Sequence, residues 1–195
     1  MIRFFDILIS ISCLILLFPL LLLIALLIKF SSKGPVIFAQ QRVGKNNIDF
    51  TLYKFRTMYM LTSDRSSLTI GNKDKRITGI GYFLRKYKID ELPQLYNVLK
   101  NEMSIVGPRP ELRKYVAIYT DEQKNILLAK PGITDNASIF FRNENELLAI
   151  QDDPESFYIT EILPVKIQLN KQYASKRTIR KYFVIIFNTL LSVFK

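Results

Sequence analysis

The sequence contains no histidine and only one cysteine, Cys13. Without histidine, a histidine general base, a histidine metal ligand and a Ser-His-Asp triad are all excluded. A single cysteine cannot form an intramolecular disulfide or a cysteine-rich metal site, and its place in an apolar run indicates a small buried residue. Any metal must therefore be held by oxygen ligands, which favours magnesium or manganese over zinc.

Acidic residues are scarce relative to basic ones. The 195 residues include 28 Lys and Arg but only 17 Asp and Glu, a formal net charge of +11. This excess indicates an acidic partner, which could be nucleic acid, anionic lipid or a phosphorylated substrate. The length suits one domain with a modest core, in addition to any part that lies in lipid.

One long hydrophobic run lies near the N-terminus, over residues 7–28. A straight helix of that length spans about 33 Å, enough to cross a bilayer core. Pro19 lies in the middle of the run, where it removes one backbone hydrogen bond and kinks the helix. The residues alone leave two interpretations open: a spanning helix with a tolerated kink, or a re-entrant helix-break-helix that returns to the same face.

Basic residues flank both ends of this run, with Arg3 before it and Lys29 and Lys33 after it. The positive-inside rule therefore assigns no direction to a spanning helix. A hairpin with both ends in the cytoplasm satisfies the same rule.

The remaining sequence predicts an α+β domain that is mostly helical with short strands. Strands are expected over residues 36–40 and 50–58, where Lys54 and Arg56 would share one face. A short basic helix over residues 79–86 carries Arg85. Further helices are expected over residues 90–99, with Asp90 as the N-cap, and over residues 113–128.

The most informative stretch runs from Lys88-Ile89-Asp90-Glu91-Leu92-Pro93-Gln94-Leu95 to Ser104-Ile105-Val106-Gly107-Pro108-Arg109-Pro110. An acidic first turn that complements the helix dipole explains most Asp-Glu pairs by itself. Here, however, Arg85 precedes the pair, and Arg109 follows it between two prolines that stiffen the backbone. The planar fork of arginine can donate two hydrogen bonds to a phosphate, although Pro-Arg-Pro by itself reads as an ordinary rigid turn. The longer combined motif is more specific than the Asp-Glu pair.

Together with the apolar N-terminal segment, these motifs resemble the signature of the small bacterial monotopic phosphoglycosyl transferases. The resemblance runs from about Arg3 to the basic segment near Arg180. It implies transfer of a sugar-1-phosphate from a UDP-sugar to a polyprenol phosphate such as undecaprenyl phosphate. It also implies that Asp90 is the nucleophile, that UMP is released, and that the product starts a capsule, O-antigen, exopolysaccharide or glycoprotein glycan.

The resemblance also assigns roles to further residues. Asp90 would contact a Mg²⁺ ion, and Glu91 would assist the acceptor phosphate or the metal. The residues expected to bind substrate phosphates are Lys54, Arg56, Arg85, Arg109 and Arg142. Pro19 would mark the break of a re-entrant membrane helix, although Phe18-Pro19 replaces the Ser-Pro that is common there.

A second departure from the common family pattern follows Pro131-Gly132-Ile133-Thr134. Many members continue with Gly-Trp, whereas this chain has Asp135-Asn136-Ala137-Ser138. The change falls where nucleotide or sugar recognition is expected, so the resemblance does not name the sugar.

The expected organisation is a re-entrant membrane helix over residues 1–33 and a cytoplasmic catalytic domain over residues 34–195. No acidic residue occurs from Ile162 onwards, and the apolar stretch over residues 182–194 fits an interfacial amphipathic helix. UDP-sugars are cytoplasmic, which places the catalytic domain on the cytoplasmic face of the bacterial inner membrane, in contact with its lipids.

Two other functions are weighed against this one. A non-catalytic basic membrane adaptor would use the same charge and amphipathic tail, but it does not explain the Asp90, Glu91 and Arg109 arrangement. Nucleic-acid binding is disfavoured because the cations lie beside apolar segments and no known nucleic-acid motif occurs. The oligomeric state is left open, and a homodimer is compatible with the sequence.

Overall fold

The computed structural model of the protein describes residues 1–60, 71 and 74–193. Helices and short strands are mixed along the chain, which confirms the expected mixed helix and strand class. The strands are β1 (Ile37–Val43), β2 (Asp49–Phe55), β3 (Ser104–Val106) and β4 (Gly132–Thr134). The α-helices are α1 (Ile2–Ser31), α2 (Gly79–Lys86), α3 (Gln94–Leu99), α4 (Arg113–Val116), α5 (Asp121–Lys124), α6 (Asn136–Phe140), α7 (Glu144–Ala149), α8 (Pro154–Phe157), α9 (Leu163–Ser175) and α10 (Ile179–Val193). The shorter helical turns are η1 (Lys45–Asn47), η2 (Ile89–Glu91), η3 (Asn125–Leu128) and the π-helix η4 (Tyr158–Ile162).

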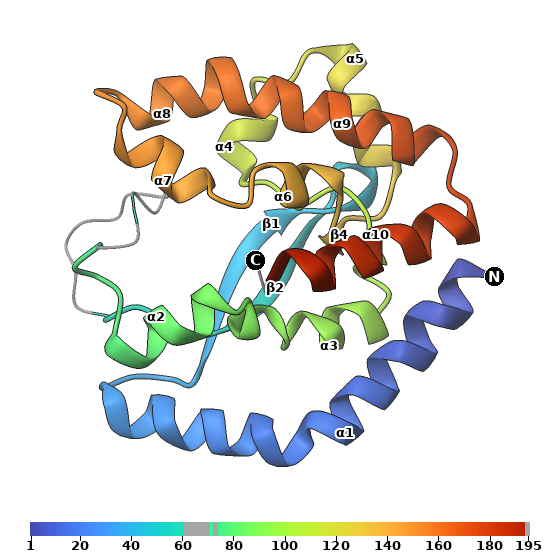
Figure 1. Ribbon diagram of the computed structural model, residues 1–195. Helices are drawn as coiled ribbons and strands as arrows, with labels where there is room; N and C mark the ends of the chain where they lie inside the picture. Colours follow the sequence, from blue (N-terminus) through green and yellow to red (C-terminus); the bar gives the residue numbers. More distant parts are fainter. Residues whose placement is uncertain (61–70, 72–73, 194–195) are drawn as a thin grey trace.

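Helix α1 is hydrogen-bonded over 30 residues and contains Pro19. Figure 1 shows that its two halves run in different directions, with a bend between them. Proline has no N–H to donate, so the bend has a direct cause in the sequence. Large apolar side chains around the bend face outward: Ile15 is 72% exposed and Leu16 80%. Among the described helices, α1 is the one long and apolar enough to cross a membrane.

Both ends of α1 pack on the same domain. In its first half, Arg3 donates hydrogen bonds to the carbonyls of Val98 and Leu99, at 2.6 and 3.1 Å. In its second half, Ile24 and Ile28 are buried in a cluster with Phe55 and Leu84. The bend therefore lets one continuous helix contact the domain twice while its middle stays exposed.

Asp6 lies in the first half of α1 and is buried, with 2% of its surface exposed. Its carboxylate accepts hydrogen bonds from the Ser104 hydroxyl (2.9 Å), the Ile105 backbone N–H (3.0 Å) and the Tyr182 hydroxyl (2.9 Å). These donors belong to β3 and α10, so a single carboxylate joins α1 to two distant parts of the chain. No local signal in the sequence marks Asp6 for this role, because its partners lie 98 and 176 positions away.

Two small sheets organise the domain. Strands β1 and β2 form an antiparallel hairpin in which Ile37 pairs with Phe55. Strands β3 and β4 are parallel, with Ser104 beside Gly132. A Cβ atom on Gly132 would lie 2.1 Å from the backbone nitrogen of Gly107, so only glycine permits this approach. The close pairing brings the segment after β4 next to the segment after β3.

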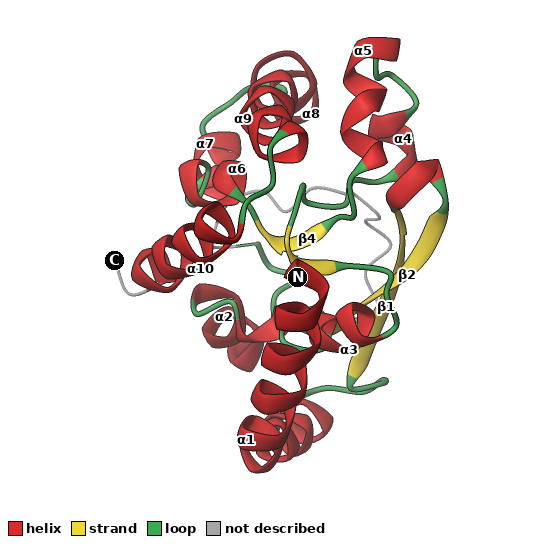
Figure 2. Ribbon diagram, turned by 90° about the vertical axis from the view of Figure 1, so that its right-hand side faces the viewer, coloured by secondary structure: helices red, strands yellow, loops and turns green. Residues whose placement is uncertain are grey.

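The elements lie in layers. In both Figure 1 and Figure 2, α1 forms one outer layer, α2 and α3 lie next to it, and α8 and α9 form the opposite side. One buried cluster lies under α9 and includes Tyr158, Leu163 and Ile167. Another, with Met103 and Tyr182, lies between β3, α10 and the first half of α1.

Two expected helices are wrong in their extent. Residues 90–99 were expected to form one helix capped by Asp90, but Asp90 lies inside the 3₁₀ turn η2, and α3 begins only after Pro93. Proline is well tolerated at a helix start, so it marks the beginning of α3 and leaves the carboxylates in a separate tight turn.

Residues 113–128 were also expected to form one helix. They form α4, α5 and η3 instead, because Thr120 interrupts them with a capping box whose other member is Gln123.

Candidate active site

Asp90 and Glu91 lie in η2, directly after α2. Lys88 precedes this turn with φ of 56°, a left-handed conformation that is uncommon for a side-chain-bearing residue and reverses the chain sharply. The turn contacts both β2 and α2. Both carboxylates are buried, each with 7% of its surface exposed.

The Glu91 carboxylate is held by two cations. Lys54 Nζ from β2 lies 2.8 Å from Oε1, Arg109 Nη2 lies 2.6 Å from the same oxygen, and Arg109 Nη1 lies 3.3 Å from Oε2. Burial by itself would raise the pKa of Glu91, but the charges of Arg109 and Lys54 outweigh it and hold the pKa well below the usual range. Glu91 is therefore a fixed anion that orients two cationic side chains.

Asp90 has a different environment from its neighbour. Its Oδ1 is buried and has no hydrogen-bond partner among the described residues. Burial and the adjacent Glu91 charge raise the pKa of Asp90, while the charges of Lys54, Arg85 and Lys88 oppose this rise. Two neighbouring carboxylates thus have separate roles: Glu91 is fully paired, whereas Asp90 retains an unpaired oxygen.

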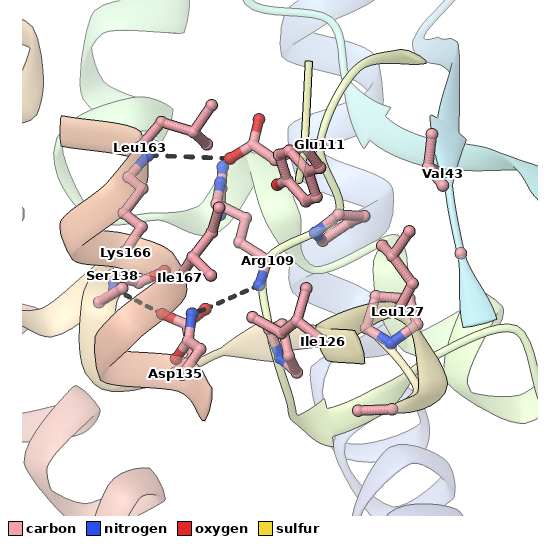
Figure 3. Close-up of a pocket in the computed structure, with 18 residues that line it drawn as sticks. Val43, Arg109, Glu111, Ile126, Leu127, Asp135, Ser138, Leu163, Lys166 and Ile167 are labelled. Carbon is pink, nitrogen blue, oxygen red and sulfur yellow. Dashed lines mark hydrogen bonds and ion pairs between the residues drawn. The ribbon is translucent and has the colours of Figure 1, made fainter. Parts of the chain in front are cut away.

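Arg109 is held at both ends. Its guanidinium pairs with Glu91, and its backbone N–H donates to Asp135 Oδ2 at 2.7 Å. Figure 3 shows Asp135 receiving both this bond and one from the Ser138 backbone at the start of α6. The amide of Asn170 on α9 donates to the same Oδ2 at 2.7 Å. Asp135 therefore joins α6 and α9 to the Pro-Arg-Pro loop.

The structure brings together five of the predicted site residues: Asp90 and Glu91 with the cations Lys54, Arg85 and Arg109. The roles of Asp135 and Asn170 were missed. Asp135 had been noted only as a departure from the common family pattern, and no local signal in the sequence places Asn170 near Arg109.

Arg56 lies elsewhere. Its guanidinium donates to the carbonyls of Ile28 and Ser32, at 3.1 and 2.7 Å, and to the Ser32 hydroxyl. In this structure Arg56 binds carbonyls at the C-terminal end of α1, whereas Lys54 binds Glu91. The predicted role of Arg56 in phosphate binding stays a prediction.

Arg142 lies in the turn between α6 and α7. Among the described residues, its side chain makes no hydrogen bond or ion pair with Asp90 or Glu91. Its predicted role in phosphate binding stays a prediction.

The oxygen ligands present can be compared with what Mg²⁺ requires. The described residues contain no cluster of three or more acidic, histidine or cysteine side chains that could hold a metal by themselves. Mg²⁺ commonly takes one or two carboxylates and fills its remaining positions with substrate phosphates and water. The unpaired, buried Oδ1 of Asp90 is a carboxylate oxygen that could hold one position of such a site.

Comparisons with known proteins show the family of the chain. Residues 1–195 match the family model described as bacterial sugar transferase. A UDP-N-acetylgalactosamine-undecaprenyl-phosphate N-acetylgalactosaminephosphotransferase of Aeromonas hydrophila is 43% identical over 140 residues, which make up 70% of this chain and 33% of that protein. An undecaprenyl-phosphate glucose phosphotransferase of Komagataeibacter xylinus is 51% identical over 109 residues, which make up 55% of this chain and 20% of that protein.

A relative of similar length also matches. The exopolysaccharide production protein ExoY of Rhizobium meliloti is 33% identical over 207 residues, which cover 98% of this chain and 84% of that protein. The chain thus spans a third or less of the two larger relatives but most of this one.

Proposed function

This chain belongs to the bacterial sugar transferase family, and we propose that it transfers a sugar-1-phosphate from a UDP-sugar to undecaprenyl phosphate, releasing UMP. The observation that carries the proposal is the pair in η2: Asp90 with an unpaired buried oxygen, beside Glu91 fixed by two cations. The relatives named for such transfers use different sugars, N-acetylgalactosamine in one and glucose in another, so their names leave the sugar open.

Asp90 is the proposed nucleophile. One of its carboxylate oxygens attacks the phosphorus attached to the sugar, the bond from that phosphorus to the UMP oxygen breaks, and UMP leaves with the electron pair. The phospho-sugar stays on Asp90 as an acyl phosphate. An oxygen of undecaprenyl phosphate then attacks the same phosphorus, the bond to Asp90 breaks, and the carboxylate is restored. Two steps of this kind replace one difficult transfer.

Arg109, Lys54 and Arg85 are the proposed phosphate-binding residues. Glu91 holds the first two in place through its ion pairs, so they are oriented before the substrate arrives. The charge of Arg85 on α2 acts on Asp90, which supports the proposed role of Arg85 as a third phosphate-binding cation. Mg²⁺ bound through Asp90 would neutralise charge on the diphosphate and stabilise the leaving UMP.

We also propose that α1 is re-entrant and that the catalytic domain faces the cytoplasm of the bacterial inner membrane. Both ends of α1 contact one domain, and its exposed apolar middle lies at the bend. A spanning helix would carry its two ends to opposite faces of the bilayer, which these contacts oppose. A single cysteine inserted directly after Met1, or placed at Lys33, in a Cys13→Ala background tests this in intact cells. Labelling of either one from outside would overturn the re-entrant arrangement.

The enzymatic proposal is tested with protein in nanodiscs, Mg²⁺, undecaprenyl phosphate and a panel of UDP-sugars. We expect acceptor-dependent UMP release with at least one sugar, lost by about a thousandfold or more in Asp90→Asn. The matched control is Asp121→Asn, an exposed aspartate of α5. Full activity in Asp90→Asn contradicts the assigned nucleophile.

The alternative, a non-catalytic basic membrane adaptor, predicts no release with any sugar and unchanged membrane binding in Asp90→Asn. The buried pairing of Glu91 with two cations favours the enzyme, because an adaptor has no use for it.

A further inference from the structure

Arg109 belongs to a loop whose backbone has few hydrogen-bond donors. Pro108 and Pro110 have no N–H, so the N–H of Arg109 is the one backbone donor of these three residues. That N–H donates to Asp135 Oδ2 at 2.7 Å, as Figure 3 shows. The Asp135 side chain therefore binds the single N–H of the Pro-Arg-Pro segment.

The peptide group between Pro108 and Arg109 is bonded at both of its ends. Its carbonyl accepts from the Gly132 N–H at 3.0 Å, and its N–H donates to Asp135. A peptide group is planar and includes the Cα atom of the residue that follows, so bonds at its two ends fix the Cα of Arg109. Asp135 thus helps to set the point from which the Arg109 side chain extends to Glu91.

Asp135 is itself held from two further elements and is buried, with 1% of its surface exposed. Its Oδ1 accepts from the Ser138 N–H in α6, and its Oδ2 also accepts from Asn170 Nδ2 on α9, at 2.7 Å. A buried carboxylate with three donors around it is a rigid support for the Arg109 backbone.

Capping of α6 does not by itself explain this carboxylate. An N-cap needs only the bond to the Ser138 N–H, and asparagine or serine serves as an N-cap about as well as aspartate. The donors on the other side, Arg109 N–H and Asn170 Nδ2, both require a second accepting oxygen. Only an acidic side chain provides two such oxygens.

We propose that Asp135 is a positioning residue for the transfer reaction: acting through the backbone of Arg109, it sets where the guanidinium meets the phosphates of the donor. The proposal rests on the proposed function, in which Arg109 binds those phosphates. An arginine displaced by about 1 Å keeps its charge at the site but loses the alignment of its hydrogen bonds, so the rate falls more than the attraction.

The variant Asp135→Asn tests this assignment, because it replaces one oxygen by an NH₂ group of the same size. The remaining oxygen can still accept from the Ser138 N–H. Asn170 can turn its amide so that Oδ1, which has no partner among the described residues, accepts from the new NH₂ group. Arg109 N–H alone then faces a donor in place of its acceptor. The matched control is Asp153→Asn, an exposed aspartate that caps α8 through two backbone N–H groups.

The measurement is UMP release with the donor that the unaltered protein uses best. In Asp135→Asn we expect kcat to fall about tenfold while KM changes by less than about twofold, and in Asp153→Asn both should stay within about twofold. Equal kinetics in the two variants would show that Asp135 only caps a helix, which overturns this proposal while UMP release still supports the proposed function. No UMP release from the unaltered protein overturns the proposed function and this proposal with it.

A loss of folded protein would also lower kcat, so the same substitution is made in an Arg109→Lys background. Lysine carries a point charge on a flexible stem and has no plane to align, so the effect of Asp135→Asn should shrink there to less than about twofold. A general structural effect lowers kcat about tenfold in both backgrounds and overturns the proposal. If Asp135→Asn does not fold, Asp135→Ser takes its place in both backgrounds, since its single hydroxyl can cap α6 but leaves Arg109 without an acceptor.

Discussion

Arg109 and Glu91, 18 residues apart in the sequence, form an ion pair with two contacts: Nη2 lies 2.6 Å from Oε1, and Nη1 lies 3.3 Å from Oε2. The same Glu91 oxygen also accepts from Lys54 at 2.8 Å. These contacts fix two flexible cations, Arg109 and Lys54, beside Asp90.

Arg109→Lys tests the geometry of this pair. Lysine keeps the charge but cannot donate two bonds from one plane, so orientation is lost while attraction remains. We expect kcat/KM for UMP release to fall by about 10- to 100-fold, the equivalent of one charged hydrogen bond. The control is Arg113→Lys, an exposed arginine that binds Asp49. Equal activity in both variants would show that the two-point contact is not required.

Removal of divalent metal tests the role of the unpaired Asp90 oxygen. We expect EDTA to abolish UMP release, and Mg²⁺ or Mn²⁺ to restore it, since both ions accept carboxylate and phosphate oxygens. The measurement is UMP release before chelation, in EDTA, and after each ion is added back. Full activity in EDTA would remove the metal from the proposed mechanism.

Asp6→Ala tests the link between α1 and the domain. The substitution leaves the Ser104 hydroxyl, the Ile105 N–H and the Tyr182 hydroxyl without their acceptor. Each orphaned donor costs about 1–3 kcal/mol, so thermal unfolding in nanodiscs should begin at a clearly lower temperature. Asp121→Ala, with an exposed carboxylate, should leave the unfolding temperature unchanged. Equal unfolding temperatures for Asp6→Ala and Asp121→Ala would contradict the structural role of Asp6.

Alkaline pH is expected to destabilise the fold through buried tyrosines. Burial raises the pKa of Tyr173 to about 12 and raises that of Tyr158 further. An unfolded tyrosine loses its proton near pH 10, so above that pH the unfolded state binds fewer protons and the free energy of unfolding falls. The raised pKa of Tyr173 adds to the free energy of unfolding. That stabilisation is complete below about pH 10 and is lost as the pH rises to about 12.

Tyr173→Phe isolates this effect, because the Tyr173 hydroxyl is buried without a partner among the described residues. At neutral pH the variant should unfold at or above the temperature of the unaltered protein. Above pH 10 the difference should grow in favour of phenylalanine, as followed by circular dichroism. Tyr96→Phe, an exposed tyrosine, is the control. A difference that does not change with pH would contradict the prediction.

Local sequence signals predicted the local elements well. The basic helix over residues 79–86 is confirmed as α2, and both strands of the hairpin lie within a few residues of the expected ranges. The carboxylates and the Pro-Arg-Pro loop were found because their types and spacing resemble a known motif. The expected extent of the helices failed where Pro93 and Thr120 start new ones.

Residues whose partners lie far along the chain were not predicted. Asp135 contacts Arg109 and Asn170 only because β3 and β4 are parallel neighbours. Strands of three residues are too short for this pairing to be predicted from the sequence. Arg56 was assigned to phosphate binding by the resemblance, and no signal in the sequence indicated that its guanidinium would bind the carbonyls of Ile28 and Ser32 at the end of α1. In each case tertiary packing decided what a spacing rule could not.

The Asp6–Tyr182 hydrogen bond has a consequence for biosynthesis. The two residues are 176 positions apart, so the ribosome makes Asp6 long before its partner. During that interval the carboxylate can bind Ser104 once β3 has been made, but its bond to Tyr182 is still missing. This contact of the first helix therefore closes only after almost the whole domain has been synthesised, so a chain that stops short of Tyr182 leaves α1 less firmly joined to the domain.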